Sequence, residues 1–478
     1  MSSTDDRIER LERQVELLLA RVEALEAENA TLRVENATLK AENADLRRQL
    51  GANSSNSNKP PSTDSPADRN ARRKDPPSGR PRGGQRGHKG HKRTFLPPDK
   101  VRSATHCYPE QCRRCEAKLA KRRDPDPIRH QVVDVPKVEP IADDYWLHRV
   151  ICTCGETTCG TLPSGVPEGM LGPQVLALIA VLTADGHMSR RKVQRLLRDA
   201  FGIEVSLGAL SESEQIVSDA VAPAVDEARL HAVTEKVKHV DATTWRQAGA
   251  YRSLWTLATA SVTVFMIATD GTRATLQAWL RRFTGVLVSD RGTQFDFWVV
   301  TRRQICWAHL IRKFAALSER SGRPGEIGSE LLGWSRVMLH AYHRVRDGTA
   351  SRAELRRIMT NIRALMEQLL EEGAALPVKG LRGACKNILG HREAMWRFVI
   401  DPTVEPTNNH AERELRGLVC WRRSSGGSQS ERGNQFAANL KSVIHTCRKQ
   451  RRHVLSYLSS TIHAALRNRE TPSLLAAA

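Results

Sequence analysis

The chain has 478 residues, of which 74 are Lys or Arg and 53 are Asp or Glu, so its formal net charge is +21. A chain of this length can bury a sizeable core and should form several domains. The basic surplus favours a polyanionic partner, above all nucleic acid. The sequence has no apolar run long enough to span a bilayer and no secretory signal at its acidic, polar N-terminus, so we expect a cytosolic protein that reaches DNA and has no membrane partner.

Residues 8–50 follow a heptad pattern that predicts a parallel coiled coil. Apolar residues recur at alternating spacings of three and four, and the repeat ENATL, ENATL, ENADL places Asn29, Asn36 and Asn43 at intervening core positions. Buried Asn at such positions costs stability but fixes register and favours two strands. We therefore expect residues 1–50 to form a homodimer or a higher oligomer. The alternative is one amphipathic helix that packs on its own domain.

Residues 51–95 are predicted to be a basic, disordered linker, because Pro, Gly and Ser are too frequent there for a packed core. The stretch from Arg69 to Arg93 is strongly basic, and Asp75 is its single acid. Such a segment would neutralise phosphates and make DNA binding sensitive to salt. The piece RPRGGQRG suits a minor groove, and a solvated linker without specific contacts is the alternative.

Residues 96–165 are predicted to form a small zinc-binding domain. Zinc prefers four thiolates in a tetrahedron, and two closely spaced cysteine pairs would supply them. The alternating pattern between the pairs predicts strands that would bring them together. Cys107 or Cys159 could replace one ligand, and buried cysteines without metal are the alternative. The four expected ligands are Cys112, Cys115, Cys152 and Cys154.

Residues 166–232 are predicted to be helical. The sequence SRRKVQRLLRDAF indicates an amphipathic helix, Gly202 a turn, and Ser206 the cap of a second helix, which together form a helix-turn-helix pattern. In a DNA-binding role, Arg190 and Arg191 would contact the nucleic acid. The same pattern also occurs in ordinary helical bundles.

The pattern changes to strands in residues 233–450. Three consecutive strands, a helix and a fourth buried strand predict a mixed sheet with helices. Asp241 is expected to end the first strand and Asp290 the fourth, where ligands gather in α/β sheets, and Glu412 lies on a helix far downstream. Three such carboxylates can converge on two Mg²⁺ ions, which prefer oxygen ligands and can activate an attacking oxygen while stabilising a leaving one.

Five motifs make the sequence similar to a known family: HVDATTWR, GVLVSDRG, RQICWAHLIRKF, TNNHAERELR and SSGGSQSERGNQFAANLKSVIHTCRKQRRHVLSYL. With the zipper, the linker and the cysteine pairs, they resemble the transposases of the insertion-sequence-66 family, which are of the DDE type with a ribonuclease-H-like core. The resemblance implies a catalytic triad of Asp241, Asp290 and Glu412, with two Mg²⁺ or Mn²⁺ ions. It also implies a helical insertion at about 320–400, small accessory proteins of the same element, and a location in the bacterial cytosol in association with the nucleoid. Lys441 stands where the family pattern leads us to expect a small hydroxyl residue.

Residues 407–416, TNNHAERELR, surround the third acid. Asn408 or Asn409 is expected to cap the helix, and Glu412 would then lie in its first turn, where the helix dipole stabilises a carboxylate. Arg416 would pair with Glu412 or contact phosphate. The basic residues expected to contact DNA are Arg190, Arg191, Arg413, Arg416, Arg422, Arg423, Arg432 and Lys441.

Cys306 and His309, in the motif CWAH, are expected to support the site. A metal site would need two more ligands, and none lies nearby in sequence. We therefore interpret the pair as packing and hydrogen-bonding residues, with His309 close to the scissile DNA.

The predicted fold is multidomain α+β, with a C-terminal helix and tail at 451–478. The sequence favours a DNA transposase that binds element ends and catalyses Mg²⁺-dependent cleavage and strand transfer. A non-enzymatic DNA-binding regulator with a zinc site and a helix-turn-helix accounts for residues 1–231 but leaves the acidic core without a purpose. A ribonuclease-H-like nuclease that cuts without joining is the second alternative.

Overall fold

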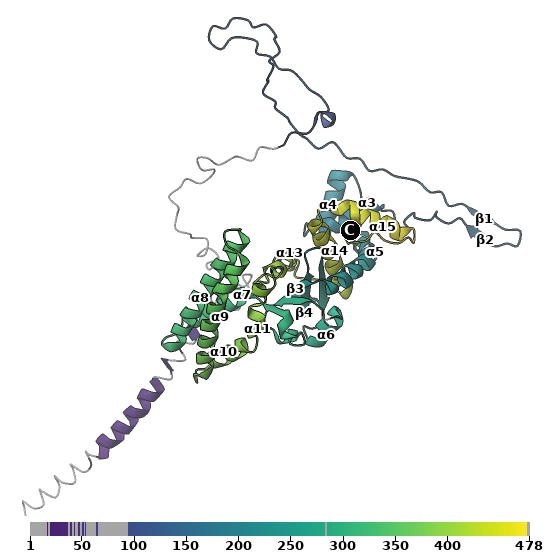
Figure 1. Cartoon of the computed structure of the whole chain (residues 1–478). Helices are drawn as coiled ribbons and strands as arrows, with labels where there is room; N and C mark the ends of the chain where they lie inside the picture. Colours follow the sequence, from purple (N-terminus) through teal and green to yellow (C-terminus); the bar gives the residue numbers. More distant parts are fainter. Residues whose placement is uncertain are drawn as a thin grey trace, which may run out of the picture.

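The computed structural model describes residues 94–282 and 284–475, together with residues 17, 20–36, 39–40, 43, 46–47, 50–51, 53 and 64–65 (Figure 1). Residues 20–36 are helical, and Leu25 and Leu32 on this helix are about half exposed. Exposed apolar residues at heptad positions are expected for a helix that pairs with a second copy of itself. The coiled coil itself stays a prediction, and most of the predicted linker lies outside the described residues.

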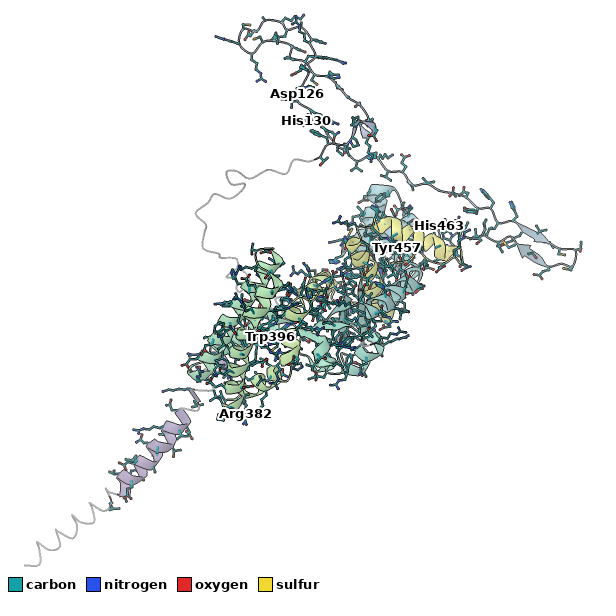
Figure 2. The ribbon with its side chains drawn as sticks, in the orientation of Figure 1. Asp126, His130, Arg382, Trp396, Tyr457 and His463 are labelled. Carbon is teal, nitrogen blue, oxygen red and sulfur yellow. The ribbon has the colours of Figure 1, made fainter. Side chains whose placement is uncertain are left out.

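Residues 94–165 extend away from the folded body, as the labelled Asp126 and His130 show in Figure 2. This segment has one short 3₁₀ helix, η2 (Pro98–Lys100), and one antiparallel pair, β1 (Arg149–Ile151) with β2 (Thr157–Cys159). The strands expected between the cysteine pairs were wrong for residues 130–148, which have no regular structure. Alternating valines there have no partner strand and no core to cover, so Val135 remains 82% exposed.

Three helices follow, in the places that the sequence predicts: α3 (Pro173–Ala184), α4 (Arg190–Phe201) and α5 (Leu207–Thr234). Gly202 ends α4 with φ of 65°, a left-handed conformation that glycine adopts without strain. Ser206 caps α5, where its hydroxyl accepts a hydrogen bond from the backbone N–H of Ala209. Because α5 also packs against the sheet, this region is joined to the core that follows.

The central sheet has five strands in the order β5-β4-β3-β6-β7. β3, β6 and β7 are parallel, whereas β4 is antiparallel to both of its neighbours. The sequence predicts four of these strands, and the bounds of the five are β3 (Val237–Gln247), β4 (Ala250–Ala258), β5 (Thr263–Ala268), β6 (Val286–Ser289) and β7 (Arg303–Ile305). The prediction of a mixed sheet with helices is confirmed.

β7 escapes the sequence pattern because two of its three residues are polar although all three are buried. The Arg303 guanidinium donates to the Asp290 carbonyl at 3.1 Å, and the Gln304 amide donates to the Met395 carbonyl at 3.1 Å. Buried polar groups are tolerated where they find such partners. A periodicity of apolar residues cannot reveal a strand of this kind.

Two hydrophobic cores surround the sheet. One contains residues of β3–β5 with α3, α5, α6 (Arg273–Leu280) and the C-terminal helices. The other contains residues of β6 and β7 with the helices that follow β7 up to residue 400. The helices of the second core are α7 (Trp307–Ser318), α8 (Arg323–Arg346), α9 (Arg352–Ala375), α10 (Arg382–Leu389), α11 (Arg392–Met395) and α12 (Arg397–Ile400). Two 3₁₀ turns, η3 (Thr293–Phe295) and η4 (Val300–Arg302), connect β6 to β7.

The C-terminal part contains α13 (Asn409–Ser425), α14 (Glu431–Lys449) and α15 (Val454–Leu466). α14 covers the outer edge of β5, where the Thr446 and Ser442 hydroxyls accept from the backbone N–H groups of Thr263 and Phe265 at 3.0 and 2.9 Å. These bonds satisfy edge groups that would otherwise pair with another strand. Among the described helices, none is long and apolar enough to cross a bilayer.

Candidate active site

The registers of three parallel strands align the first two predicted acids. His239 pairs with Val288, so continuing β3 and β6 by two residues sets Asp241 opposite Asp290. Ser289 pairs with Ile305, so one residue further Asp290 lies opposite Cys306. Asp290 follows the end of β6 as expected. Asp241 does not end β3: the strand continues to Gln247 because its second half still pairs with β4.

Asn408 fixes the start of α13 against β3. Its side chain is 1% exposed, donates through Nδ2 to the Val240 carbonyl at 2.9 Å, and contacts His239 Nδ1 through Oδ1 at 3.2 Å. The expectation that Asn408 caps α13 with its side chain was wrong, because that amide is used by the strand instead. Asn409 is the first residue of the helix.

Glu412 lies in the first turn of α13, as the sequence predicts, and its backbone N–H donates to the Asn408 carbonyl at 3.1 Å. Its nearest basic contact is His309, with Nδ1 and Oε1 3.8 Å apart. The expected pair with Arg416 is not formed, since Arg416 is exposed and has no ion pair among the described residues. Glu412 Oε1 is enclosed yet has no hydrogen-bond partner.

The electrostatics show that the three acids are near one another. Burial, together with the negative charges of Asp290 and Glu412, raises the pKa of Asp241 to about 8. A hydrogen bond from the Ala242 N–H at 2.9 Å and the charge of Arg312 oppose this shift without cancelling it. The structure therefore brings Asp241, Asp290 and Glu412 from β3, the end of β6 and α13 into one region, where burial and the two neighbouring acids disfavour the ionised form of Asp241.

Cys306 and His309 flank the same region. Cys306 immediately precedes α7 and His309 lies in its first turn, and their ligand atoms lie within 4.8 Å of each other and of a Glu412 oxygen. Burial, and then the charges of Arg312 and Arg291, lowers the pKa of His309 to about 4, so the ring is neutral at neutral pH. The sequence did not predict a third ligand here, because Glu412 is remote along the chain.

A second polar cluster anchors α13 to α14 and was missed in the sequence. Glu414 contacts His445 Nδ1 at 2.5 Å, Lys449 Nζ at 3.3 Å and His410 Nε2 at 3.6 Å. Burial alone would raise the pKa of Glu414, but hydrogen bonds from His410 and His445 and the charge of Lys449 hold it well below its usual range. The i,i+4 spacing of His410 and Glu414 was the available signal.

The predicted DNA-contacting residues fall into two groups. Arg191, Arg413, Arg416 and Arg423 are exposed and form no ion pair with another residue that the structure describes. Others have partners: Arg190 bonds to Glu214 at 3.1 Å through Nε, Arg422 donates to Thr244 Oγ1 at 2.8 Å, and exposed Arg432 donates to Ser211 at 2.5 Å.

The prediction for Lys441 was wrong. Its side chain is 2% exposed, with Nζ 3.2 Å from His187 Nε2 and 3.8 Å from Asp185 Oδ1. Burial lowers the pKa of Lys441 to about 8. The residue lies on the face of α14 that packs against the loop after α3, so it holds two parts of the chain together and cannot reach a phosphate.

The four predicted zinc ligands do not form one cluster in the described structure, where the group that could hold a metal is Cys306, His309 and Glu412. Each pair is nevertheless preformed. A backbone hydrogen bond from Arg114, with others from Cys115, lowers the pKa of Cys112. The corresponding bonds from Cys154 lower the pKa of Cys152.

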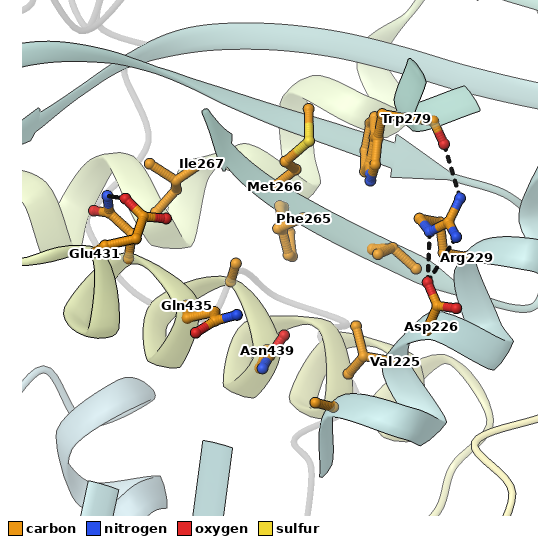
Figure 3. A pocket seen from close by; sticks show the side chains of 14 residues that line it. Val225, Asp226, Arg229, Phe265, Met266, Ile267, Trp279, Glu431, Gln435 and Asn439 are labelled. Atoms are coloured by element: carbon orange, nitrogen blue, oxygen red, sulfur yellow. Dashed lines mark hydrogen bonds and ion pairs between the residues drawn. The ribbon is translucent and has the colours of Figure 1, made fainter. Parts of the chain in front are cut away.

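A cavity of about 310 Å³ lies between α5, β5 and α14 (Figure 3). Asp226, Arg229 and Glu431 are its charged residues, and Arg229 already donates to Asp226 and to the Trp279 carbonyl. None of the three acids lines this cavity, so it is separate from the candidate active site.

Comparison with known proteins identifies the class. The model of the transposase IS66 family matches residues 168–436, which is more than half of the chain. The chain therefore belongs to the IS66 transposase family. Residues 5–94 match a family of unknown function, DUF6444.

The uncharacterized protein y4qI of Sinorhizobium fredii (strain NBRC 101917 / NGR234) is 31% identical to the chain over 164 residues, which is 33% of this chain and 30% of that protein. The chain thus matches less than a third of the length of this curated relative.

Proposed function

We propose that this transposase cleaves DNA at the ends of its element and joins the freed 3′-OH to target DNA, with Asp241, Asp290 and Glu412 as the catalytic residues. The observation that carries the proposal is the convergence of these acids from three remote segments, namely the middle of β3, the end of β6 and the first turn of α13. The strand order β5-β4-β3-β6-β7, in which β4 alone runs antiparallel to the other four strands, supports a ribonuclease-H-like core.

The acids fit a pair of hard divalent cations. All three offer carboxylate oxygens, which Mg²⁺ and Mn²⁺ prefer. The raised pKa of Asp241 reflects first its burial and then the negative charges of Asp290 and Glu412, and Glu412 Oε1 has no hydrogen-bond partner among the described residues. When bound, two Mg²⁺ ions would supply Lewis-acid activation of the attacking oxygen and stabilisation of the leaving oxygen.

The chain's own residues would orient the DNA and the acids. β3 and β6 fix the first two carboxylates through the backbone, and Asn408 holds the start of α13 so that Glu412 faces them. Arg413 and Arg416 are exposed on α13, the helix that carries Glu412, and would bind DNA phosphates near the cleavage site. Water would be the nucleophile for cleavage and the 3′-OH the nucleophile for joining.

The test uses Asp241→Asn, Asp290→Asn and Glu412→Gln, with Asp219→Asn on the exposed face of α5 as the matched control. Each of the three active-site variants should lose Mg²⁺-dependent cleavage of end-containing DNA while binding that DNA with nearly wild-type affinity. Retained cleavage in any of them would refute its assignment. DNA binding with no cleavage by the wild type would favour a regulator, and cleavage without joined products would favour a nuclease.

We also propose that Cys112, Cys115, Cys152 and Cys154 hold one structural zinc and that residues 1–50 pair two copies. The two preformed cysteine turns support the first proposal, and the exposed heptad leucines support the second. Metal analysis of freshly purified protein should find zinc, and the zinc content should fall by about one equivalent per chain when Cys112 and Cys152 are replaced by Ser. Protein without zinc would contradict the first proposal.

A further inference from the structure

A second metal-ligand group lies beside the three acids. It consists of the Cys306 thiol, the His309 ring and the Glu412 carboxylate, whose ligand atoms lie within 4.8 Å of one another. The first two come from one helical turn at the start of α7, where residues three apart lie on the same face. The third comes from the first turn of α13.

Two hydrogen bonds donated by backbone N–H groups hold these two turns together. The Trp307 N–H donates to the Pro406 carbonyl at 3.0 Å, and the Asn408 N–H donates to Cys306 Sγ at 3.1 Å. The second bond orients the sulfur and would stabilise its thiolate, as outer hydrogen bonds to metal ligands do. The two bonds therefore hold the start of α7 against the start of α13, and the three ligand atoms lie near one another without an ion.

Two atoms of the group are enclosed and have no partner: His309 Nδ1 and Glu412 Oε1. They lie 3.8 Å apart, too far for a hydrogen bond between them and close enough for both to coordinate one ion. Leaving polar atoms buried and unpaired costs free energy. A bound cation would satisfy both atoms.

We propose that Cys306, His309 and Glu412 bind one borderline-soft divalent cation of the zinc class. A set of sulfur, nitrogen and oxygen donors suits Zn²⁺ or Co²⁺, whereas Mg²⁺ avoids thiolates. A thiolate, a carboxylate and a neutral imidazole carry a charge of −2, which balances the dication. Three protein ligands leave one tetrahedral position for water or a DNA oxygen. This site goes beyond the proposed Mg²⁺ activity and shares Glu412 with it.

The experiment is a Co²⁺ titration of the full-length chain in which the cysteines of the N-terminal region are replaced by Ser, so that their sulfurs give no signal. The replaced residues are Cys107, Cys112, Cys115, Cys152, Cys154 and Cys159. One equivalent of Co²⁺ should give a thiolate-to-cobalt charge-transfer band with tetrahedral d–d bands, and Zn²⁺ should displace it. Adding Cys306→Ser should abolish the charge-transfer band, and adding Cys447→Ser, at an equally buried cysteine of α14, should leave it unchanged.

Glu412→Gln is the second variant, because it keeps both the thiol and the packing around it. It should retain a sulfur band but weaken Co²⁺ binding by at least the roughly 10-fold that loss of an outer-shell partner costs. No charge-transfer band in the parent chain, or a band that persists in Cys306→Ser, would overturn the proposal. The readout needs no DNA, so its failure leaves the proposed cleavage activity untouched.

Discussion

The ionisation of Asp241 should make the metal-free transposase less stable as the pH rises. The group's folded pKa of about 8 lies above its ordinary value of 3.8, so between these values the folded chain binds the proton that the unfolded chain releases. Its contribution to stability is fully present below about pH 4 and is lost as the pH rises through 8. Asp241→Asn cannot ionise, so the variant should lack this loss.

The size of the effect follows from the shift. Each pKa unit is worth about 1.36 kcal/mol, so a shift of roughly 4 units corresponds to about 6 kcal/mol before solvent screening. Because the Asp241 side chain is only partly buried, we take about half of that, ~3 kcal/mol. At roughly 2–4 °C per kcal/mol for a large domain, Asp241→Asn should melt about 6–12 °C above wild type near the top of this pH range.

The assay is thermal melting in a chelator at several pH values, with Asp219→Asn as the control for replacing an exposed acid. The difference in melting temperature between Asp241→Asn and wild type should vanish near pH 4. It should also become smaller when Mg²⁺ is added, because Mg²⁺ at about 100 times its Kd stabilises wild type by ~2.7 kcal/mol. Equal melting of Asp241→Asn and wild type in chelator at every pH would refute the convergence of the three acids. An equal gain from Asp219→Asn would do the same.

Three further outcomes are expected. Asn408→Ala leaves the Val240 carbonyl unpaired and should cost about 1–3 kcal/mol in denaturant unfolding, with cleavage reduced more than DNA binding because Glu412 loses its anchor. Lys441→Met should leave DNA affinity and its salt dependence as in wild type, whereas Arg423→Ala should reduce the slope of log affinity against log salt by about 1. Deleting residues 1–50 should convert the oligomer to a monomer in light scattering.

Each of these outcomes has a contrary result. Cleavage by Asn408→Ala at the wild-type rate would show that the helix start is held by other contacts. A reduced salt slope in Lys441→Met would place this residue at the DNA after all. An unchanged molar mass after the deletion would exclude the N-terminal helix as the dimer contact.

The strands and acids could be predicted from sequence because local pattern determines them. Runs of apolar residues around Asp241 and Asp290 predict buried strands, and an acid within one of these strands and just beyond the other indicates the candidate site. β7 could not be predicted in this way, because Arg303 and Gln304 are buried by virtue of partners elsewhere in the chain. The family resemblance assigned Glu412, whose distance along the chain gives no local signal.

The contacts that individual side chains make in the fold were the second feature that the sequence could not predict. Asn408 is a residue type that often caps helices, yet its side-chain amide bonds to β3 instead, because Oδ1 contacts His239 Nδ1 and Nδ2 donates to the Val240 carbonyl. Lys441 belongs to a basic run, yet its position on the helix turns it inward to Asp185. Cys306 and His309 lacked a third ligand until the fold brought Glu412 to them. In all three cases the deciding contact comes from a residue remote in sequence.

The helices between β7 and α13 contribute to the hydrophobic core and do not serve only as a connection between these two elements. Val286, Val288 and Ile305 of the sheet share one hydrophobic core with them. A shortened chain that kept the strands and the acids but dropped these helices would expose the apolar side of β6 and β7 to water. A shortened version of this transposase would therefore need new apolar residues to cover β6 and β7, in addition to a loop that joins β7 to α13.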